Sequence, residues 1–478
     1  MNGLSQKRYL ELPLPTEDDP RSDQQRILDS LAAAGVEERV HIPVHILRQL
    51  YPLLDNAKWK ITVSLAWNGE NWEMVEIEEG DTTAQHYGLA VDLGSTTVVA
   101  RLLDCNRGEI LEEVSCFNKQ IQWGTDILSR IFYCKDNREK LEEVRRATVE
   151  SICECMDKLA ASHSALSMVI AGNTTMIHFL LGMDAFCVFY TPHAVHADRP
   201  GFQLARDLDI PLKGYVYCYP AKSNYLGGDI ISGMIDTELY KKNEISVFFD
   251  IGTNGELVIG NKEFLLCGAG AAGPALEGGV VRTGMRAEAG AVDEVKIRDG
   301  NIYVHVIGSH EGDSGSHEKN LGNHEENSSS EEPRGICGSG IIDLIAELFL
   351  EGWIDIRGKL SPEKSPLIQE RDNQLCVEYA PGLYFYQKDI DEFIRTKSAA
   401  HTMVEIMLRE SGLELSQTDR FYVAGAFGKH VSKESAITIG MYPDMDRDHI
   451  INAGNSSCLL YTSPSPRDLS TSRMPSSA

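Results

Sequence analysis

Two stretches of the chain place polar residues in the middle of an otherwise apolar pattern. The sequence YGLAVDLGSTTVVARLLD, residues 87–104, is an apolar run interrupted by Asp92, Gly94 and three hydroxyl side chains. The sequence ISVFFDIGTNGELVIGN, residues 245–261, has the same layout around Asp250. Apolar runs on both sides of a glycine-containing turn are typical of a β-hairpin. The pattern therefore predicts two hairpins of the same design, one in each half of the chain.

Amphipathic stretches follow each hairpin and predict long helices. Apolar residues recur at helical spacing in residues 125–161 of the first half and in residues 335–355 and 390–412 of the second. This internal duplication predicts two lobes of similar topology that face each other across a cleft. We expect lobe 1 at residues 86–244 and lobe 2 at residues 245–458.

The segments outside this repeated plan have different patterns. Residues 1–20 are polar and contain proline, so we expect an irregular arm. Residues 21–85 combine short helical stretches with the strand-like runs KWKITVSLAW and NWEMVEIEEG, which predicts a small α+β domain. Residues 309–333 are rich in acidic and small polar residues and predict a disordered insertion in lobe 2. The histidines of this insertion could suggest a metal site, but without a scaffold to hold them a solvated loop is the better interpretation.

The end of the chain changes character abruptly. Residues 459–478 contain 11 Ser, Thr or Pro residues and no pattern that would build a core. We expect either a non-native tail, produced when a gene model runs into adapter sequence, or a genuine disordered tail. On the first interpretation the sequence is a gene fragment.

Composition excludes several classes of protein. The chain has 478 residues and a formal charge of −26, which argues against nucleic acid or an anionic membrane as a partner. No apolar run is long enough to span a membrane, and the N-terminal residues lack the apolar core of a secretory signal. The 11 cysteines are scattered, which fits reduced thiols. We therefore expect a cytoplasmic protein.

The polar residues of the two hairpins have the chemistry of a phosphate site. Glycine lets a main chain approach a ligand, while hydroxyl groups, amides and backbone N–H groups donate to phosphate oxygens. Carboxylates would repel phosphate, so we assign Asp92 and Asp250 as catalytic residues that hold Mg2+ through its waters or orient an attacking water. One copy of this pattern could be a plain polar turn, but two matched copies favour a clamp on a triphosphate. The residues predicted to bind phosphate are Gly94, Ser95, Thr96 and Thr97 in the first loop and Gly252, Thr253, Asn254 and Gly255 in the second.

Two further segments carry candidate nucleotide contacts. In FYVAGAFGKH, an apolar strand ends in a glycine-rich turn on which adenine and ribose could lie. The adenosine candidates are Gly425, Ala426, Phe427 and Gly428. In AGNTTM, three polar residues follow an apolar strand and could face the same cleft, although a helix N-cap explains them as well. These residues are Asn173, Thr174 and Thr175.

The two hairpin loops and the glycine-rich turn of FYVAGAFGKH, in this order, resemble the superfamily of acetate and sugar kinases, chaperone ATPases and actin. The resemblance implies a two-lobed actin-like α/β ATPase fold, with duplicated ribonuclease-H-like lobes around a nucleotide cleft and a small α+β N-terminal domain. Longer motifs narrow the resemblance to one family within this superfamily. Among them are IQWGTDILSRI, VIAGNTTMIHFLLG, YLGGDIISGMI, GAGAAGPALEGGVVRTGMRAEAGAV and RGICGSGIIDLIAEL. With them, residues 87–457 look like the C-terminal ATPase part of the reductive activators of corrinoid proteins, and residues 21–85 look like that family's middle domain.

This resemblance implies an ATP-hydrolysing activase that returns an inactivated Co(II) corrinoid protein to Co(I) and so restores a methyl-transfer protein. It implies ATP and Mg2+ as cofactors, and as partners a corrinoid protein, a ferredoxin-type electron donor and a second copy of the chain in a homodimer. Members of the family begin with a ferredoxin domain recognised by Cys-x4-Cys-x2-Cys. That spacing does not occur here, where the first cysteine is Cys105. We therefore expect no ligands for an iron–sulfur cluster, and either a truncated gene model or a separate ferredoxin.

Two other functions stay open at this point. A small-molecule kinase of the same superfamily needs a base beside its acceptor hydroxyl, and no sugar pocket is identifiable in the sequence. A nucleotide-switched binding protein would use ATP only to move its lobes and so bind and release a partner.

Overall fold

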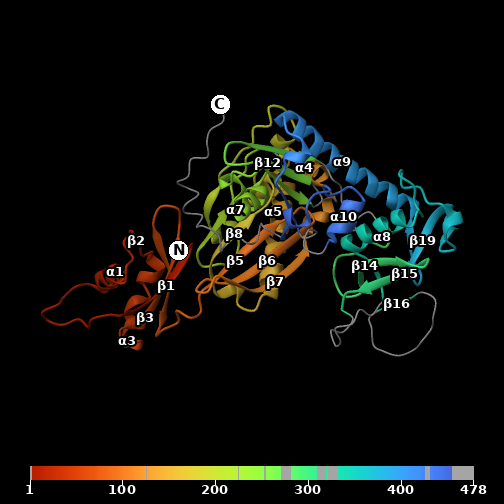
Figure 1. Cartoon of the computed structure of the whole chain (residues 1–478). Coiled ribbons are helices and arrows are strands. Elements are labelled where there is room, and N and C mark those ends of the chain that lie inside the picture. Colours follow the sequence, from red (N-terminus) through yellow and green to blue (C-terminus); the bar gives the residue numbers. More distant parts are fainter. Residues whose placement is uncertain are drawn as a thin grey trace. The chain divides into compact units, whose positions relative to one another are not determined.

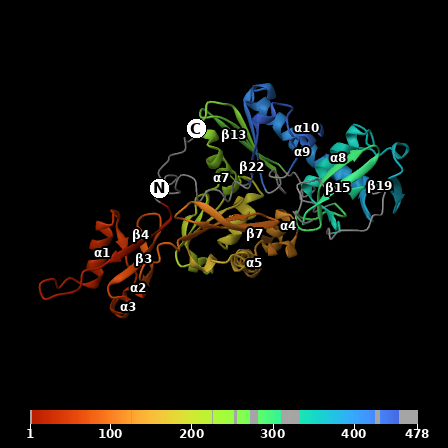
Figure 2. The same cartoon turned by 60° about the horizontal axis from the view of Figure 1, so that its bottom comes forward.

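The computed structural model of the chain describes residues 3–124, 126–223, 226–251, 255–270, 281–308, 319–320, 332–425 and 431–454. The chain divides into two compact units whose boundary in the sequence falls between Asp236 and Thr237. The elements of each unit are labelled in Figure 1 and seen from a second direction in Figure 2. Within the described part of the chain, no helix combines the length and the apolar character that crossing a membrane requires.

The N-terminal part of the first unit is a small α+β domain, as the sequence predicts. Its elements are β1 (Ser5–Glu11), α1 (Asp23–Ala33), β2 (Val40–His41), α2 (Val44–Leu47), α3 (Leu50–Asn56), β3 (Lys60–Trp67) and β4 (Trp72–Glu79). The strand order is β1-β3-β4-β2. Ser22 caps α1 by accepting a hydrogen bond from the Gln25 N–H group, and Ile27 and Leu31 of this helix are buried in the domain core.

The expectation of an irregular arm at residues 1–20 is wrong for its first part, because β1 pairs antiparallel with β3 along its whole length. The buried face of β1 includes polar side chains. Lys7 forms an ion pair of 2.6 Å with Glu78, and the Ser5 hydroxyl lies 2.9 Å from a ring nitrogen of His86. A strand whose buried face is partly polar lacks apolar alternation, so the pattern gave no signal for it.

The rest of the first unit is built on a mixed sheet. Its elements are β5 (Tyr87–Leu93), β6 (Thr97–Asp104), β7 (Glu109–Phe117), α4 (Ile127–Cys134), α5 (Arg138–Lys158), β8 (Ala165–Ala171), α6 (Thr174–Leu180), β9 (Gly201–Leu204), β10 (Tyr215–Cys218) and α7 (Gly228–Thr237). The strand order is β7-β6-β5-β8-β10-β9, in which β5, β8 and β10 are parallel and the other neighbouring pairs are antiparallel. Helix α5 packs on β6 and β7 (Figure 2).

The second unit repeats this arrangement. The elements of its main sheet and the helix between its last two strands are β11 (Ser246–Ile251), β12 (Gly255–Gly260), β13 (Leu265–Gly270), β21 (Arg420–Ala424), α10 (Lys433–Thr438) and β22 (Ile450–Gly454). The strand order is β13-β12-β11-β21-β22, with antiparallel pairs on one side of β11 and parallel pairs on the other. The run β7-β6-β5-β8-β10 of the first unit has the same order and directions. The duplicated α/β topology predicted from the two hairpins is therefore confirmed.

The second unit also contains elements inserted between β13 and β21. They are β14 (Ala291–Arg298), β15 (Asn301–Val306), β16 (Lys319–Asn320), β17 (Gly335–Ile336), α8 (Gly338–Leu350), β18 (Ile368–Arg371), β19 (Gln374–Ala380), β20 (Leu383–Tyr386) and α9 (Gln387–Ser411). Most of the insertion predicted at residues 309–333 lies outside the described residues, but β16 falls within it and pairs with β15. The tail predicted at residues 459–478 also lies outside them.

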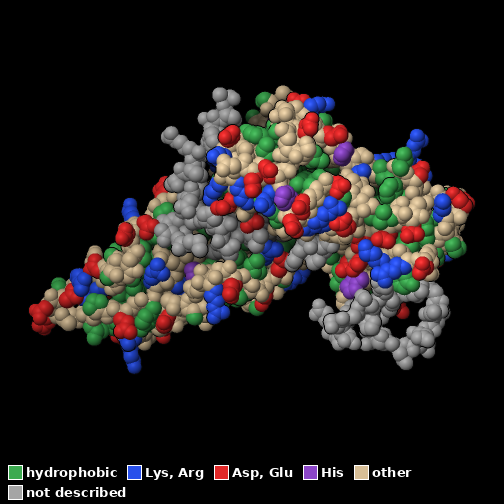
Figure 3. Space-filling view, in the orientation of Figure 1, with side chains coloured by type: hydrophobic (Ala, Val, Ile, Leu, Met, Phe, Trp, Pro, Cys, Tyr) green, Lys and Arg blue, Asp and Glu red, His purple; other side chains and the backbone are tan. Residues whose placement is uncertain are grey.

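Each main sheet is anchored by its own cluster of buried apolar side chains. One cluster joins β5, β6 and β8 with α5 and α6, and the other joins β11 and β12 with α8 and α9. At the surface, acidic and basic side chains of the described residues are interspersed on the face shown in Figure 3. The strands that carry the predicted loops are thus fixed by packing, which holds the ends of the loops in defined places.

Candidate functional site

The first predicted phosphate loop joins two buried strands of the first unit. Asp92 is the penultimate residue of β5, and its register partner in β8 is Ala171. Residues 94–96 make the turn, and Thr97 begins β6. A Cβ atom on Gly94 would lie 2.4 Å from the Thr97 carbonyl oxygen, so glycine is required to close the turn. The sequence suggested that this glycine makes room for a ligand, and the structure gives it a role inside the loop.

The hydroxyl side chains of this loop differ in exposure. Ser95 is 6% exposed, whereas Thr96 and Thr97 are half-buried. A ligand approaching from solvent therefore reaches the two threonines more easily than the serine.

The second loop occupies the equivalent place in the second unit. Asp250 is the penultimate residue of β11, and its register partners are Glu256 in β12 and Ala424 in β21. Gly255 is buried and begins β12. The turn itself lies outside the described residues and consists of Gly252, Thr253 and Asn254. Asp92 and Asp250 thus hold the same position in two sheets of the same strand order.

The predicted adenosine turn begins at the end of β21. Gly425 directly follows Ala424, the register partner of Asp250, so it lies at the same sheet edge as the second loop. Gly425 has a φ of 96°, which favours glycine, and its N–H group donates to the Gly454 carbonyl at 3.0 Å. The other adenosine candidates lie outside the described residues and are Ala426, Phe427 and Gly428.

The segment Asn173–Thr175 follows β8 and begins α6. The Asn173 side chain accepts a hydrogen bond from the Met176 N–H group at 3.0 Å, so the N-cap interpretation is correct for this residue. The Thr174 hydroxyl donates to the Ser223 carbonyl at 2.6 Å, and Thr175 is only 2% exposed. Because Ala171 is in register with Asp92, this segment lies at the edge of the first loop. A direct contact of these side chains with nucleotide stays a prediction.

Asp229 was not predicted from the sequence, and it lies at the same edge as Asp92. It is in the first turn of α7, where the Gly228 N–H group donates to the Gly172 carbonyl at 2.8 Å and so joins α7 to the end of β8. A Cβ atom on Gly227 would lie 2.3 Å from that carbonyl oxygen, so this approach requires glycine. The signal was present in the sequence as two glycines directly before an acidic residue.

Asp229 and Asp92 influence each other's charge. Burial raises the pKa of Asp229 above its usual range, and the negative charge of Asp92 raises it further. Since two carboxylates at one sheet edge repel each other, the pair can share a proton or hold a divalent cation through its waters. Asp229 therefore joins Asp92 as a candidate for the part of the site that handles metal and water.

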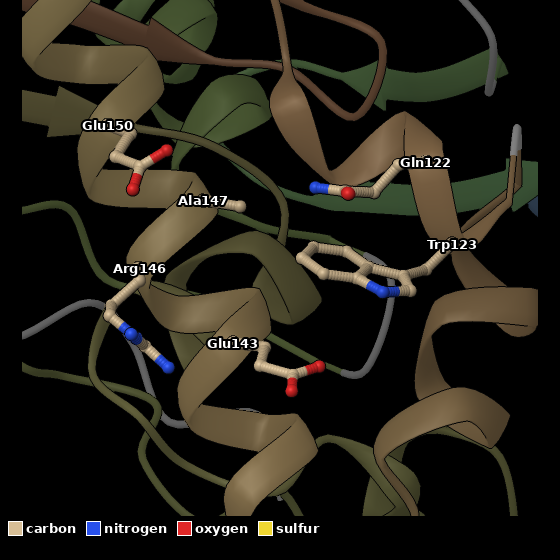
Figure 4. Close-up of a pocket in the computed structure, with 6 residues that line it drawn as sticks. All are labelled: Gln122, Trp123, Glu143, Arg146, Ala147 and Glu150. Atoms are coloured by element: carbon tan, nitrogen blue, oxygen red, sulfur yellow. The ribbon is translucent and has the colours of Figure 1, made fainter.

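An open groove elsewhere in the first unit contains none of the predicted site residues. It lies between the 3-10 helix η1 (Lys119–Trp123) and α5, and its volume is about 200 Å³. It is lined by Gln122, Trp123, Glu143, Arg146, Ala147 and Glu150 (Figure 4). The groove is smaller than the roughly 300 Å³ at which small-molecule sites begin, so we do not assign the nucleotide to it.

Three family models match consecutive parts of the chain. Residues 1–84 match the RACo linker region, residues 87–242 match the RACo middle region, and residues 244–463 match the C-terminal domain of RACo, the ASKHA domain. These boundaries correct one expectation, since residues 21–85 fall in the linker region and not in the middle domain. Both lobes were expected in the C-terminal part of the family, whereas the family boundary falls between them.

The chain is also similar to individual proteins over most of its length. A solved structure of a reductive activator for corrinoid, iron–sulfur protein matches it with a TM-score of 0.86 and 33% identity, covering 99% of this chain and 74% of that one. The corrinoid activation enzyme RamQ of Eubacterium limosum is 29% identical over 392 residues, which are 77% of this chain and 62% of RamQ. A Co(II) methylated amine-specific corrinoid protein reductase of Methanosarcina barkeri is 23% identical over 386 residues, 78% of this chain and 69% of the reductase. This chain thus spans less than two thirds of the length of RamQ. With its actin-like fold, it belongs to the family of reductive activators of corrinoid proteins.

Proposed function

We propose that this chain is an activase that couples ATP hydrolysis to the one-electron reduction of a corrinoid protein from Co(II) to Co(I). The observation that carries the proposal is the matched pair of hairpins, with Asp92 and Asp250 at the same position of two sheets. The family supports it, since the relatives include a corrinoid activation enzyme and a Co(II) corrinoid protein reductase. The expected cytoplasmic location and homodimer belong to the same proposal.

In this proposal the loops at the sheet edges bind different parts of ATP. Backbone N–H groups of the first loop and the hydroxyl groups of Thr96 and Thr97 donate to phosphate oxygens. Adenosine lies on the turn that begins at Gly425. Asp92 and Asp250 are the two candidates for orienting the attacking water. The carboxylate beside that water accepts its proton as the bond to the γ-phosphorus forms and the bond to the leaving ADP oxygen breaks.

The carboxylates fit Mg2+ in the form in which it accompanies ATP. Such an ion is usually held by one or two carboxylates, by phosphate oxygens and by several waters. Asp92 and Asp229 at one edge of the first unit supply this number of carboxylates. When bound, Mg2+ neutralises charge on the phosphates, while the carboxylates hold its waters in place.

The electron must come from another centre, because ATP hydrolysis supplies energy but no electron. The sequence contains no Cys-x4-Cys-x2-Cys spacing. We assign the donor as a ferredoxin-type iron–sulfur centre, which loses one electron as Co(II) gains it. ATP hydrolysis makes this otherwise unfavourable transfer proceed by changing how the corrinoid protein is held.

The test is a visible-absorption assay for Co(I). The purified chain is mixed with a corrinoid protein in its Co(II) state and a reduced low-potential ferredoxin, with and without ATP. We expect Co(I) to form only when both the chain and ATP are present, and to disappear with Asp250→Asn. ATP hydrolysis without Co(I), with any corrinoid protein offered, would contradict the activase and favour a nucleotide-switched binding protein.

A further inference from the structure

The segment that begins at Asn118 and ends at Arg130, which had no predicted role in the site, donates hydrogen bonds to the first phosphate loop. Three successive carbonyl groups of the loop accept hydrogen bonds from it. The Gly94 carbonyl accepts from the Asn118 side-chain amide at 2.9 Å, and the Thr96 carbonyl accepts from the Asn118 backbone N–H group at 2.9 Å. Between them, the Ser95 carbonyl accepts from an Nη atom of Arg130 at 2.6 Å. Every carbonyl of the turn therefore accepts a hydrogen bond from Asn118 or Arg130.

This bonding decides which groups the loop presents on its other side. In a planar trans peptide the carbonyl and the following N–H group point in opposite directions. With the carbonyls of residues 94–96 directed at Asn118 and Arg130, the N–H groups of residues 95–97 are directed away from them. Successive backbone N–H groups in a turn are the kind of donors that form a concave anion site.

Arg130 is an unusual residue to find in this place because it is fully buried, with 0% exposure. Besides the Ser95 carbonyl, its guanidinium donates to the Gly124 carbonyl at 3.0 Å and to the Gln120 side-chain oxygen at 3.2 Å. Its other terminal nitrogen has no hydrogen-bond partner among the described residues. Burial lowers the pKa of Arg130 to about 10, so the group is still a cation at neutral pH.

The segment is itself tied to α5. Asn118 and Gln120 are both fully buried, and the Asn118 side-chain oxygen accepts from the Gln120 N–H group at 3.1 Å. The Gln120 amide donates to the Thr148 hydroxyl, and the Lys119 N–H group donates to the Ser151 hydroxyl at 2.9 Å. The loop is thus fastened, through buried polar groups, to a long helix of the same unit.

We propose that Asn118 and Arg130 are positioning residues for ATP, which fix the first phosphate loop with its N–H groups toward the phosphates and place a buried positive charge behind them. The inference rests on the proposed use of ATP. A buried cation close to the loop offsets phosphate charge more strongly than an exposed one, because little water screens it. A purely structural role would stabilise the protein equally with and without nucleotide.

The experiment compares ATP affinity with the stability of the nucleotide-free protein. ATP binding is measured by isothermal titration calorimetry, and melting temperatures are measured with and without ATP. The test variants are Arg130→Met, which removes the guanidinium, and Arg130→Lys, which keeps the charge but loses the fork of donors. The control is Arg26→Met, which removes another fully buried arginine of the first unit that binds Asp19 in the N-terminal domain.

We expect Arg130→Met to weaken ATP binding by about tenfold or more, as loss of charge-assisted hydrogen bonds predicts. Arg130→Lys should lie between this variant and the unchanged protein. Arg26→Met should alter the melting temperature and leave ATP affinity and the ATP-induced rise in melting temperature unchanged.

A second variant, Asn118→Asp, tests the same inference in case Arg130→Met does not fold. Asn118→Asp keeps the oxygen that accepts from Gln120 but replaces the donor to the Gly94 carbonyl with an oxygen, so it should also weaken ATP binding at nearly unchanged size. If either folded variant, Arg130→Met or Asn118→Asp, binds ATP as tightly as the unchanged protein, the inference is wrong. If the unchanged protein itself binds no ATP, the proposed function fails instead, and the two failures are distinguishable.

Discussion

The loops after β5 and β11 occupy equivalent places in two sheets of the same order, yet their acidic neighbours come from different elements. Beside Asp92, the second carboxylate is Asp229, which is contributed by the start of a helix far along the chain. Beside Asp250, the register partner across the hairpin is Glu256, which is 6% exposed. Residues directly opposite on paired strands lie on one face, so these two carboxylates are also close.

The two loops show that the strand order of a sheet does not decide which element supplies the second carboxylate of its loop. The order of the sheet fixes the place of the first carboxylate, at the penultimate residue of its central strand. The second carboxylate comes from whichever element reaches that edge. Duplicated folds therefore allow their two loops to diverge in role, and substitutions at equivalent positions of the two units measure how far they have diverged.

The largest expected effects are those of Asp92→Asn and Asp250→Asn. Each substitution keeps the size of the side chain and removes its charge, so we expect ATP hydrolysis to fall by about a hundredfold or more. The fold should be preserved, because both residues lie at the end of a strand and are only half-buried. Hydrolysis is measured by phosphate release and folding by circular dichroism. Near-parent hydrolysis in one folded variant alone would assign the catalytic water to the other unit.

The second largest effect is expected for Asp229→Asn, and it distinguishes Asp229 from Glu256, its counterpart in the second unit. Because burial and Asp92 raise the pKa of Asp229 above the ordinary 3.8, the folded protein loses stability as the pH rises from 3.8 to the raised value, and the full cost applies at higher pH. Asp229→Asn should therefore raise the melting temperature at pH 8 and lose this gain as the pH falls toward 4. ATP hydrolysis should decline at the same time, by about tenfold, since one ligand for the waters of Mg2+ is lost.

Glu256→Gln is the matched variant in the second unit. If it gives the same gain in stability and the same loss of hydrolysis as Asp229→Asn, the two carboxylates are equivalent in spite of their different origins. A variant Asp229→Asn that hydrolyses ATP at the parent rate would remove Asp229 from the site.

The fold followed largely from the sequence because its strongest patterns are local. The two hairpins, the α+β domain and the long helices are marked by apolar spacing within a dozen residues. Strand β1 was missed because Lys7 and Ser5 fill its buried face and are satisfied by Glu78 and His86, far away in the chain. Apolar periodicity does not detect burial of this kind.

Less of the candidate site could be predicted, because several of its residues are close together only in the folded chain. Asp92 and Asp250 could be proposed from the sequence because each lies inside its own motif. Asp229, Asn118 and Arg130 act at the first loop only after folding, and single-sequence reasoning has no measure of that proximity. Their local signals were a pair of glycines before Asp229 and an arginine on an apolar helix face, and neither signal is specific.

A third, smaller effect belongs to the first unit. His86 is 6% exposed, and burial lowers its pKa from 6.5 to about 4. Between these values the unfolded chain binds the proton and the folded protein does not, so stability falls as the pH drops through this window. The loss should reach at most about 3 kcal/mol at pH 4.

His86→Gln should flatten this acid dependence of the melting temperature. Hydrogen exchange should show the change in β1 and β5, next to His86, and not in β11 and β12 of the second unit. An unchanged slope in the variant would show that another group causes the acid sensitivity.

The smallest effect is expected in the second unit, for replacement of residues 309–333 by a short Gly-Ser linker. This segment is rich in acidic and small polar residues and offers little apolar surface to bury, so it contributes little to the free energy of unfolding. Its described part includes β16, whose two residues pair with β15 at the edge of a sheet. The loss should stay below about 1 kcal/mol, which corresponds to about 2–4 °C in melting temperature for a unit of this size. A narrower replacement of residues 321–331 keeps β16 and should cost less still. Both variants should hydrolyse ATP at the parent rate, because the segment lies apart in sequence from every loop assigned to the nucleotide. A large fall in melting temperature, or loss of a metal ion that the unchanged protein retains, would show that its histidines form a site and that the second unit carries a function without counterpart in the first.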